Sequence, residues 1–242
     1  MTRVILVGSG RMGTLLSQAI EADKDLELAG TYDVTNVSEL DGEAPVADLV
    51  IDFSNRDALP HTLAYVRRTR AALLLGTTGF SEGELAEVRA LGEATQVIWS
   101  GNYSLGVAVL RHATRLAAEA LPGWDVEIVE THHAQKADAP SGTAEMLLRE
   151  VDPAGERTVA YGRQGMVGAR PKGEVGMHSL RGGTVAGTHE VHLFGTDEEL
   201  CLTHRAGSAS IFATGAVVAA KWALSAAPGL HDFDEVLFGG AR

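Results

Sequence analysis

Residues 4–13 read Val4-Ile5-Leu6-Val7-Gly8-Ser9-Gly10-Arg11-Met12-Gly13, so the pattern G-x-G-x-x-G directly follows a short apolar run. The apolar run predicts a buried strand, and the apolar spacing of residues 12–20 predicts a helix immediately after it. In that context Gly8 permits the tight turn, Gly10 lets a pyrophosphate approach the backbone, and Gly13 lets the helix pack closely on the strand. The pyrophosphate is expected at the N-terminus of the helix. The stretch therefore predicts a Rossmann-type dinucleotide-binding unit.

An acidic residue follows the glycine pattern at the expected distance. Asp33 comes directly after a second predicted strand, residues 26–32, and its carboxylate could accept hydrogen bonds from an adenosine ribose. The alternative is an ordinary turn aspartate. Because no lysine or arginine occurs between Asp33 and Arg56, nothing just beyond the strand favours a 2′-phosphate. The sequence therefore favours NADH over NADPH, although Arg11 could reach the same phosphate and weaken the preference.

Three further predicted strands, residues 49–53, 71–75 and 97–99, alternate with predicted helices over 58–66 and 82–91. This alternation is typical of right-handed βαβ units in a parallel sheet. Ligands of such sheets bind beyond the carboxyl ends of the strands, so the loops after the last two strands are expected to contact the cofactor, unless they are simple turns. The predicted cofactor-binding residues are Gly8, Ser9, Gly10, Arg11, Met12, Gly13, Asp33, Gly76, Thr77, Thr78, Ser100, Gly101, Asn102 and Tyr103.

The pattern of predicted elements changes after about residue 103. The later elements are a helix over 104–120, a strand over 125–130, an irregular excursion over 151–177, antiparallel strands within 179–194 and 199–204, and a closing helix over 210–226 that we expect to be buried on most sides. The sequence thus predicts an α/β fold with two domains. Residues 1–103, completed by residues 208–242, form a Rossmann-type parallel-sheet domain that binds the dinucleotide. Residues 104–207 form a smaller α+β domain with a mixed or antiparallel sheet.

Residues 130–143, ETHHAQKADAPSGT, bring together two adjacent histidines, a lysine and a predicted helix start. His132 or His133 can donate a proton near neutral pH, and Lys136 adds a positive charge. Gly142 and Thr143 would present backbone N–H groups at the helix start, where a carboxylate is stabilised. The segment therefore has the groups needed to hold a small anion and protonate it. The alternatives are that both histidines are structural and that the lysine only solvates a loop.

Composition and charge limit the class of protein. The net charge of −12 argues against nucleic acid as the main partner, and no apolar run approaches the roughly 20 residues of a membrane span. The N-terminus is too short in apolar residues for a signal peptide. Cys201 is the only cysteine, which fits a reducing, cytoplasmic location, and we expect it to be a packing residue. Residues 189–192 read HExH rather than HExxH, so no metal site is expected.

Together these segments resemble the dihydrodipicolinate reductase family, also called 4-hydroxy-tetrahydrodipicolinate reductases, of the diaminopimelate route to lysine. The matches follow the family order along nearly the whole chain, and the match at 130–144 is long and highly specific. The matching segments are GSGRMG (8–13), GTTGF (76–80), NYSLG (102–106), ETHHAQKADAPSGTA (130–144), YGRQG (161–165), HSLRGGTVAGTHEV (178–191) and FATGA (212–216).

The resemblance implies a reductase of a cyclic unsaturated dicarboxylate, 4-hydroxy-tetrahydrodipicolinate, that uses NADH or NADPH. It also implies a homotetramer, assembled through the sheet of the substrate-binding domain at 104–207. Carried across by motif, His132 is the catalytic acid/base and Lys136 its proton-donating partner. His133 binds the substrate, and Gly142 and Thr143 hold a carboxylate.

Two departures from the family pattern concern the cofactor. The first glycine loop is one residue shorter than the commoner form GxxGRMG, and Ala209 stands where many members have an arginine before the last helix. That arginine's cofactor or hinge role has no obvious counterpart in this chain. Two other functions stay open at this point. One is a different nicotinamide-dependent reductase, of the aspartate- or homoserine-dehydrogenase type. The other is a non-catalytic NAD-sensing protein, which would have no need of the histidine segment.

Overall fold

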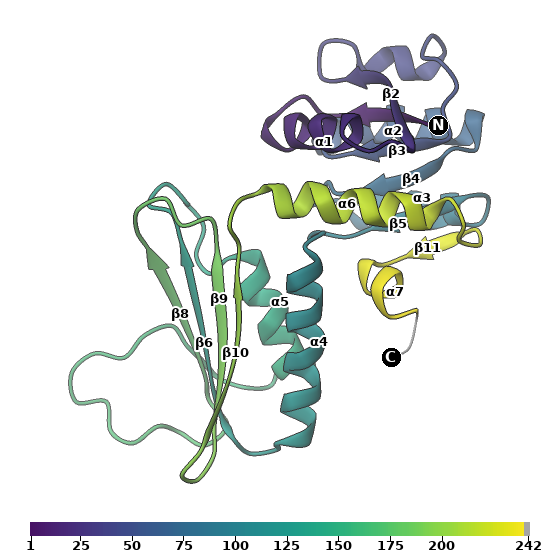
Figure 1. The fold of residues 1–242 in the computed structure, drawn as a ribbon. Helices are drawn as coiled ribbons and strands as arrows, with labels where there is room; N and C mark the ends of the chain where they lie inside the picture. Colours follow the sequence, from purple (N-terminus) through teal and green to yellow (C-terminus); the bar gives the residue numbers. More distant parts are fainter. Residues whose placement is uncertain (240–242) are drawn as a thin grey trace. The chain divides into compact units, whose positions relative to one another are not determined.

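A computed structural model describes residues 1–239, shown in Figure 1. The described chain divides into two compact units. The first unit comprises Met1–Leu105 and the segment from Ser210 onward, and the second comprises Gly106–Ala209. The domain boundaries predicted from the sequence, after residues 103 and 207, lie two residues before these divisions.

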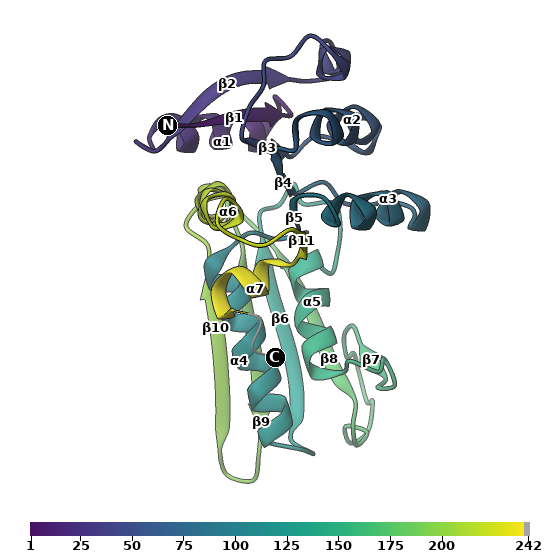
Figure 2. The same cartoon turned by 90° about the vertical axis from the view of Figure 1, so that its right-hand side faces the viewer.

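The first unit is built on a six-stranded parallel sheet in the order β11-β5-β4-β3-β1-β2. Helices α2 and α3 cover one face of the sheet, and α1 and α6 cover the other (Figure 2). The elements are β1 (Thr2–Val7), α1 (Arg11–Glu21), β2 (Leu26–Tyr32), a 3-10 turn η1 (Val37–Asp41), β3 (Leu49–Asp52), η2 (Arg56–Ala58), α2 (Leu59–Thr69), β4 (Ala72–Leu75), α3 (Glu82–Gly92), β5 (Gln96–Trp99), α6 (Ser210–Ala223), β11 (Gly229–His231) and α7 (Phe233–Phe238).

Two glycines of the first loop are required by close packing. Gly8 has a φ of +113°, a conformation that residues with a side chain rarely adopt, and a Cβ there would lie 2.5 Å from the carbonyl oxygen of Phe53. A Cβ at Gly13 would collide with the carbonyl oxygen of Gly8, so helix α1 could not begin so close to β1 with any other residue. A Cβ at Gly10 would meet nothing within 4 Å, which leaves the backbone there open to a ligand.

The second unit contains a five-stranded mixed sheet in the order β10-β9-β6-β8-β7. Helices α4 and α5 pack on one face of this sheet through an apolar core that includes Leu110, Ile128, Leu147, Met177 and Val191 (Figure 1). The elements are α4 (Leu105–Ala120), β6 (Asp125–His132), α5 (Gly142–Val151), β7 (Val159–Ala160), β8 (Val175–Arg181), β9 (Thr188–Phe194) and β10 (Glu199–Arg205). The predicted fold class, a Rossmann-type parallel-sheet domain plus a smaller α+β domain with a mixed sheet, is confirmed.

The expectation of an irregular excursion over 151–177 followed only by antiparallel strands is wrong in detail. β7 lies inside the excursion, and β8 begins at Val175 and pairs with β6 in parallel. The parallel pairing follows from the connection, because a helix, α5, lies between the two strands and carries the chain back in a crossover. The antiparallel pairs of this sheet are those that β9 forms with β6 and with β10.

Two other expectations also need correction. The closing helix α6 ends at Ala223, before the predicted limit of 226, and buries one face made of small residues, while Val218 is 39% exposed. Small residues serve that face because α6 packs closely: a Cβ at Gly215 would collide with the carbonyl oxygen of Tyr103. Cys201 is exposed rather than a packing residue. None of the helices in residues 1–239 is long and apolar enough to cross a membrane.

Candidate active site

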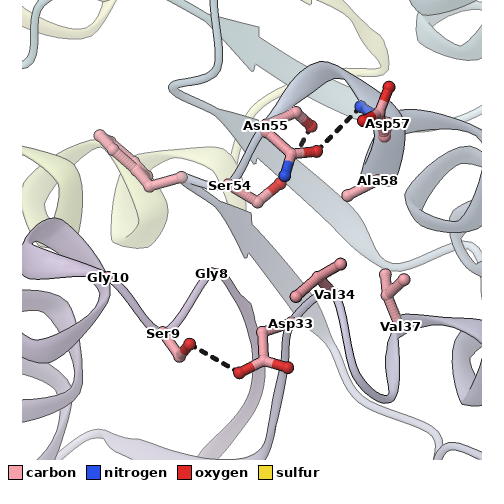
Figure 3. A pocket seen from close by; sticks show the side chains of 11 residues that line it. Gly8, Ser9, Gly10, Asp33, Val34, Val37, Ser54, Asn55, Asp57 and Ala58 are labelled. Atoms are coloured by element: carbon pink, nitrogen blue, oxygen red, sulfur yellow. Dashed lines mark hydrogen bonds between the residues drawn. The ribbon is translucent and has the colours of Figure 1, made fainter.

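The first unit has a pocket of about 290 Å³ where the chain order of its sheet reverses. β2 and β3 lie on opposite sides of β1, and the pocket is lined by the loops that follow these three strands (Figure 3). Such a reversal point, outside the carboxyl ends of the strands, is where open α/β sheets bind nucleotides. The lining residues are Gly8, Ser9, Gly10, Asp33, Val34, Val37, Phe53, Ser54, Asn55, Asp57 and Ala58.

Asp33 is held in this pocket by hydroxyl and amide donors. The Ser9 hydroxyl donates to one carboxylate oxygen at 2.6 Å, and the Thr35 hydroxyl and amide donate to the other at 2.7 and 2.9 Å. These hydrogen bonds, with Ser9 first, lower the pKa of Asp33 to about 2. A fixed negative charge therefore faces the pocket throughout the physiological pH range. Helix α1 begins beside it without a side-chain cap and without an acidic residue in its first turn, so its N-terminal dipole is not offset by a carboxylate of its own.

A second hollow of about 370 Å³ shares Phe53, Ser54 and Asn55 with the first pocket. It brings Met12 together with Gly76, Thr77 and Thr78 from the loop after β4. The sequence predicts that all four contact the cofactor, and that role stays a prediction. Gly76 has no room for a side chain, because a Cβ there would collide with the Phe53 ring. The predicted residues Arg11 and Thr78 are exposed, and Thr77 is buried.

Asp52, which the sequence reasoning did not assign to the site, ties the loops after β3 and β4 together. It is buried, accepts hydrogen bonds from the hydroxyls of Ser54 and Thr62 at 2.6 and 2.7 Å, and accepts one from Thr77 at 3.1 Å. Burial raises the pKa of Asp52. The signal available in the sequence was a polar residue at the end of an otherwise apolar strand.

The loop after β5 is held mainly by its own hydrogen bonds. The Ser100 hydroxyl donates to the carbonyl of Asn102 at 2.9 Å, and Gly101 is exposed. Tyr103 is 1% exposed, and its hydroxyl donates to the carbonyl of Leu75 at 3.0 Å. The Tyr103 side chain therefore belongs to the core of the unit, and only its backbone lies in the loop predicted to meet the cofactor. The cofactor-contact roles of residues 100–103 stay predictions.

The second unit contains a buried carboxylate that faces three donors. Glu130, at the centre of the sheet on β6, has no exposed surface. Arg181 of β8 donates one hydrogen bond to each of its oxygens, both at 2.7 Å, and the backbone amide of Ser141 donates at 3.1 Å. Although burial alone would raise the pKa of Glu130, the hydrogen bonds from Arg181 and His132 outweigh it and lower the pKa to about 2.

His132 lies two residues along the same strand face and contacts this carboxylate. Its Nδ1 is 2.6 Å from Glu130 Oε2, and its side chain is only 12% exposed. The ring packs edge-on against His189 of β9, with 5.1 Å between the ring centroids. His189 Nε2 lies 3.0 Å from the hydroxyl of Ser141, which caps helix α5. Burial, followed by the neighbouring His132, lowers the pKa of His189 to about 4, so His189 is neutral at pH 7.

The other predicted residues of the 130–143 segment lie around this cluster. The Lys136 amine donates to both oxygens of Asp138 at 2.8 Å, and Arg181 donates to the Asp138 carbonyl. His133 is partly buried, and its carbonyl accepts the Lys136 amide at 3.1 Å. Gly142 and Thr143 are the first two residues of α5, as the sequence predicted, and a Cβ at Gly142 would meet nothing within 4 Å.

Sequence reasoning missed four members of the cluster as site residues: Glu130, Arg181, His189 and, beyond its role as a helix cap, Ser141. Period-2 alternation on β6 could have placed Glu130 on the face of His132. Arg181 and His189 come from β8 and β9, and only the pairing register brings them opposite His132 and Glu130. Within residues 1–239, no group of three or more histidine, cysteine or acidic side chains is arranged to hold a metal ion.

A dinucleotide pocket at the reversal point of a parallel sheet and a histidine–carboxylate cluster on a second, mixed sheet define a two-domain oxidoreductase of the nicotinamide-dependent class. Comparison with known proteins identifies the family. Residues 2–103 match the model for the N-terminus of dihydrodipicolinate reductase, and residues 106–237 match the model for its C-terminus. The chain belongs to the dihydrodipicolinate reductase family.

Individual relatives agree with this assignment. The chain is 40% identical to the 4-hydroxy-tetrahydrodipicolinate reductase of Akkermansia muciniphila, over 98% of both chains. It is 39% identical to the enzyme of the same name from Methanoregula boonei, again over 98% of both chains. Its fold is similar to that of the dipicolinate-bound dihydrodipicolinate reductase from Paenisporosarcina sp. TG-14, with a TM-score of 0.80, 21% identity, and coverage of 96% of this chain and 97% of that one.

The lowered pKa of Glu130 predicts how the stability of the protein depends on pH. A carboxylate whose pKa is about 2 in the folded state and about 4.5 when unfolded stabilises the fold above pH 4.5. That contribution, on the order of 2–3 kcal/mol for one such carboxylate, is lost as the pH falls from 4.5 towards 2. Urea unfolding at a series of pH values should therefore show Glu130→Gln less stable than the native chain at pH 7, with the difference shrinking below pH 4.5. Glu93→Gln, at an exposed position, is the control; a pH-independent difference for Glu130→Gln would contradict the expectation.

Proposed function

We propose that this protein catalyses the NAD(P)H-dependent reduction of 4-hydroxy-tetrahydrodipicolinate to tetrahydrodipicolinate, a step of the diaminopimelate route to lysine. The observation that carries the proposal is the His132–Glu130 contact of 2.6 Å at the end of β6, in a chain that belongs to this reductase family over nearly its whole length. The contact supplies an imidazole held for proton transfer, which a protein that only senses a nucleotide would not need.

The proposed reaction adds a hydride and a proton across a conjugated imine, with overall loss of water. The reduced nicotinamide supplies the hydride when it is bound. His132 supplies the proton from Nε2, because its Nδ1 is occupied by Glu130. Lys136 is its proton-donating partner. The backbone amides at the start of α5, at Gly142 and Thr143, hold one substrate carboxylate, and His133 binds the substrate alongside them.

The Lys136 ion pair bears on how the substrate is held. Asp138 is 63% exposed, whereas the Lys136 side chain is 20% exposed, so the carboxylate is the more solvent-exposed partner of the pair. An exposed ion pair of this kind contributes only ~0–1 kcal/mol. An anionic substrate can therefore take the amine from Asp138 at little cost, and we propose that the pair keeps the lysine in place until it does.

Replacing His132 or Lys136 tests the proposed function. NADH oxidation with the cyclic substrate should be readily measured for the native chain, and His132→Gln should lower kcat by about 10²–10⁴-fold, the usual contribution of a general acid. Lys136→Ala should lower kcat and raise the KM of the substrate. His61→Gln, in the first unit and paired there with Asp41, is the matched histidine control.

Full activity in both site variants would contradict the proposed roles. Activity of the native chain with an aspartate- or homoserine-type substrate instead of the cyclic dicarboxylate would favour the alternative dehydrogenase. Cofactor binding without turnover of any of these substrates would favour a sensor.

We propose NADH as the preferred cofactor, with NADPH accepted less well. The support is electrostatic: among the described residues that line the pocket, two are carboxylates, Asp33 and Asp57, and none is a lysine or arginine. Two cations adjoin lining residues in sequence. Arg56 is paired with Glu84 at 2.7 Å, and Arg11, beside Gly10, is exposed. A 2′-phosphate placed beside Asp33 would meet its negative charge, and Arg11 is the counterion that could keep NADPH acceptable.

Removing the Asp33 charge should weaken this preference. In Asp33→Ser the ratio of kcat/KM for NADH to that for NADPH should fall by at least about 10-fold, because one hydrogen-bonding acceptor for the ribose and one repulsive charge are lost together. Fluorescence titration should show the same change in the ratio of the two cofactors' binding affinities, without turnover. Asp41→Asn, outside the pocket, should keep the native ratio. An unchanged ratio in Asp33→Ser would overturn the assignment.

We also propose a homotetramer assembled through the sheet of the second unit, in the cytoplasm. Helices α4 and α5 pack on one face of that sheet, and the opposite face exposes Leu180 (49%) and Phe194 (39%). Exposed apolar side chains of this size on a sheet favour burial against another copy. Light scattering should give a mass about four times the 25.5 kDa of one chain, and Leu180→Lys should lower it. A monomeric native protein would contradict the proposal.

A further inference from the structure

The Glu130–Arg181 pair has a geometry that stability alone does not require. A buried ion pair is often no more stable than apolar residues of the same volume, because removing two charges from water costs as much as their attraction returns. Here the carboxylate has no exposed surface and still leaves one oxygen in a 2.6 Å contact with an imidazole. The pair therefore acts on His132 at least as much as it stabilises the fold.

We propose that Glu130 and Arg181 are positioning residues that fix the tautomer and orientation of His132, so that Nε2 is the nitrogen presented for proton transfer. The inference rests on the proposed reductase function for its catalytic consequence, and on the geometry alone for the tautomer. Neither residue is proposed to contact the substrate.

The Glu130 carboxylate determines which nitrogen of His132 carries a hydrogen. An ionised carboxylate can only accept hydrogen bonds, so the imidazole nitrogen 2.6 Å from Glu130 must carry its hydrogen. Nδ1 is that nitrogen, and Nε2 is left to gain and lose the exchangeable proton. Arg181 keeps Glu130 ionised by donating to both of its oxygens, at 2.7 Å each.

A glycine leaves space around Nε2 of His132. Gly187, at the end of the loop between β8 and β9, faces that nitrogen: a Cβ on Gly187 would lie only 3.1 Å from it. The absence of a side chain there leaves Nε2 the room that a reacting group needs. The amide of Gly182, in the same loop, donates to the His132 carbonyl at 2.9 Å, which fixes the backbone under the ring.

Other charged and titratable groups lie around His132. Besides Glu130 and Arg181, they are His189 from β9, His204 from β10 beyond it, and Lys136 and Asp138 from the loop after β6. Burial lowers the pKa of both His189 and His204, so neither adds positive charge at neutral pH. Glu130 is then the charge in direct contact with the ring. Arg181 also donates to the Asp138 carbonyl at 2.7 Å, and thus connects the positioning pair to the loop that carries Lys136.

The chain offers a matched control on the same strand. Glu127 lies on the opposite face of β6 and is likewise bonded to arginines and to a histidine: Arg163 at 2.8 Å, Arg170 at 3.2 Å and His178 at 2.7 Å. Glu127→Gln removes a comparable carboxylate from the same sheet without touching His132. Any effect that arises only from losing an ion pair in this sheet should appear in both variants.

The experiment compares Glu130→Gln, Arg181→Gln and the Glu127→Gln control by activity and by NMR. A glutamine amide beneath His132 can donate as well as accept, so the Glu130→Gln variant no longer selects Nδ1–H. We expect kcat at pH 7 to fall about 10²–10⁴-fold in Glu130→Gln while the substrate KM changes less than about 3-fold, since the side chain is buried beneath His132. Arg181→Gln should change kcat in the same direction, and Glu127→Gln should keep the native kcat.

The NMR measurement does not depend on turnover. Long-range ¹H–¹⁵N spectra of the native protein at pH 8, assigned by comparison with His132→Gln, should show His132 with its proton on Nδ1. Glu130→Gln should show the Nε2–H form or a mixture. If native His132 already carries its proton on Nε2, or if Glu127→Gln lowers kcat as much as Glu130→Gln, the positioning role is overturned. A native protein with the expected tautomer but no reductase activity would overturn the proposed function and leave the tautomer assignment standing.

Discussion

The contacts of one buried carboxylate organise the second unit. Glu130 joins β6 to β8 through Arg181, to the start of α5 through the Ser141 amide, and contacts the imidazole of His132. Because a charge without exposed surface must be fully paired, none of these partners can move far without leaving it uncompensated, at a cost of several kcal/mol. The start of α5, the loop that carries Lys136 and the His132 ring are therefore all held in place by the need to pair Glu130. The same need links the arrangement of the site to the pairing of β6 with β8.

In the first unit the backbone, rather than a buried ion pair, sets the geometry of the pocket. Gly8 and Gly13 let α1 begin directly against β1, and Gly10 leaves the turn open. The side chains of the pocket act mainly as hydrogen-bond acceptors. Ser9 and Thr35 hold Asp33 on one side of the pocket, and Asp52 holds the loops on the other. A dinucleotide needs amide donors for its phosphates and an acceptor for its ribose, which explains why glycines and one aspartate carry most of the sequence signal.

This difference explains how much the sequence could predict. The alternation of strands and helices predicted the parallel sheet, and the positions Gly8–Gly13 and Asp33 were readable because their spacing along the chain is fixed by one βαβ unit. His132 and Lys136 were singled out from a local motif, and their catalytic roles stay predictions. Arg181 and His189 were not, since they reach the site only through the pairing of β8 and β9 with β6. The parallel direction of β8 was missed for the same reason: alternation shows that a strand exists, whereas its partner and direction depend on the crossover through α5.

Strand β6 shows how one segment can serve two purposes. Val126, Ile128, Glu130 and His132 face α4 and α5, and Glu127 lies on the other face with Arg163 and His178. Two glutamates three residues apart on a strand must point to opposite faces, so their charges are separated by the sheet and can be paired independently. The two faces can therefore carry independent sets of ion pairs. Gly176 makes the arrangement on the Glu127 face possible, because any Cβ there would collide with the Glu127 carboxylate. Substitutions on one face can change its charges without unpairing those of the other, although both faces depend on the same eight residues.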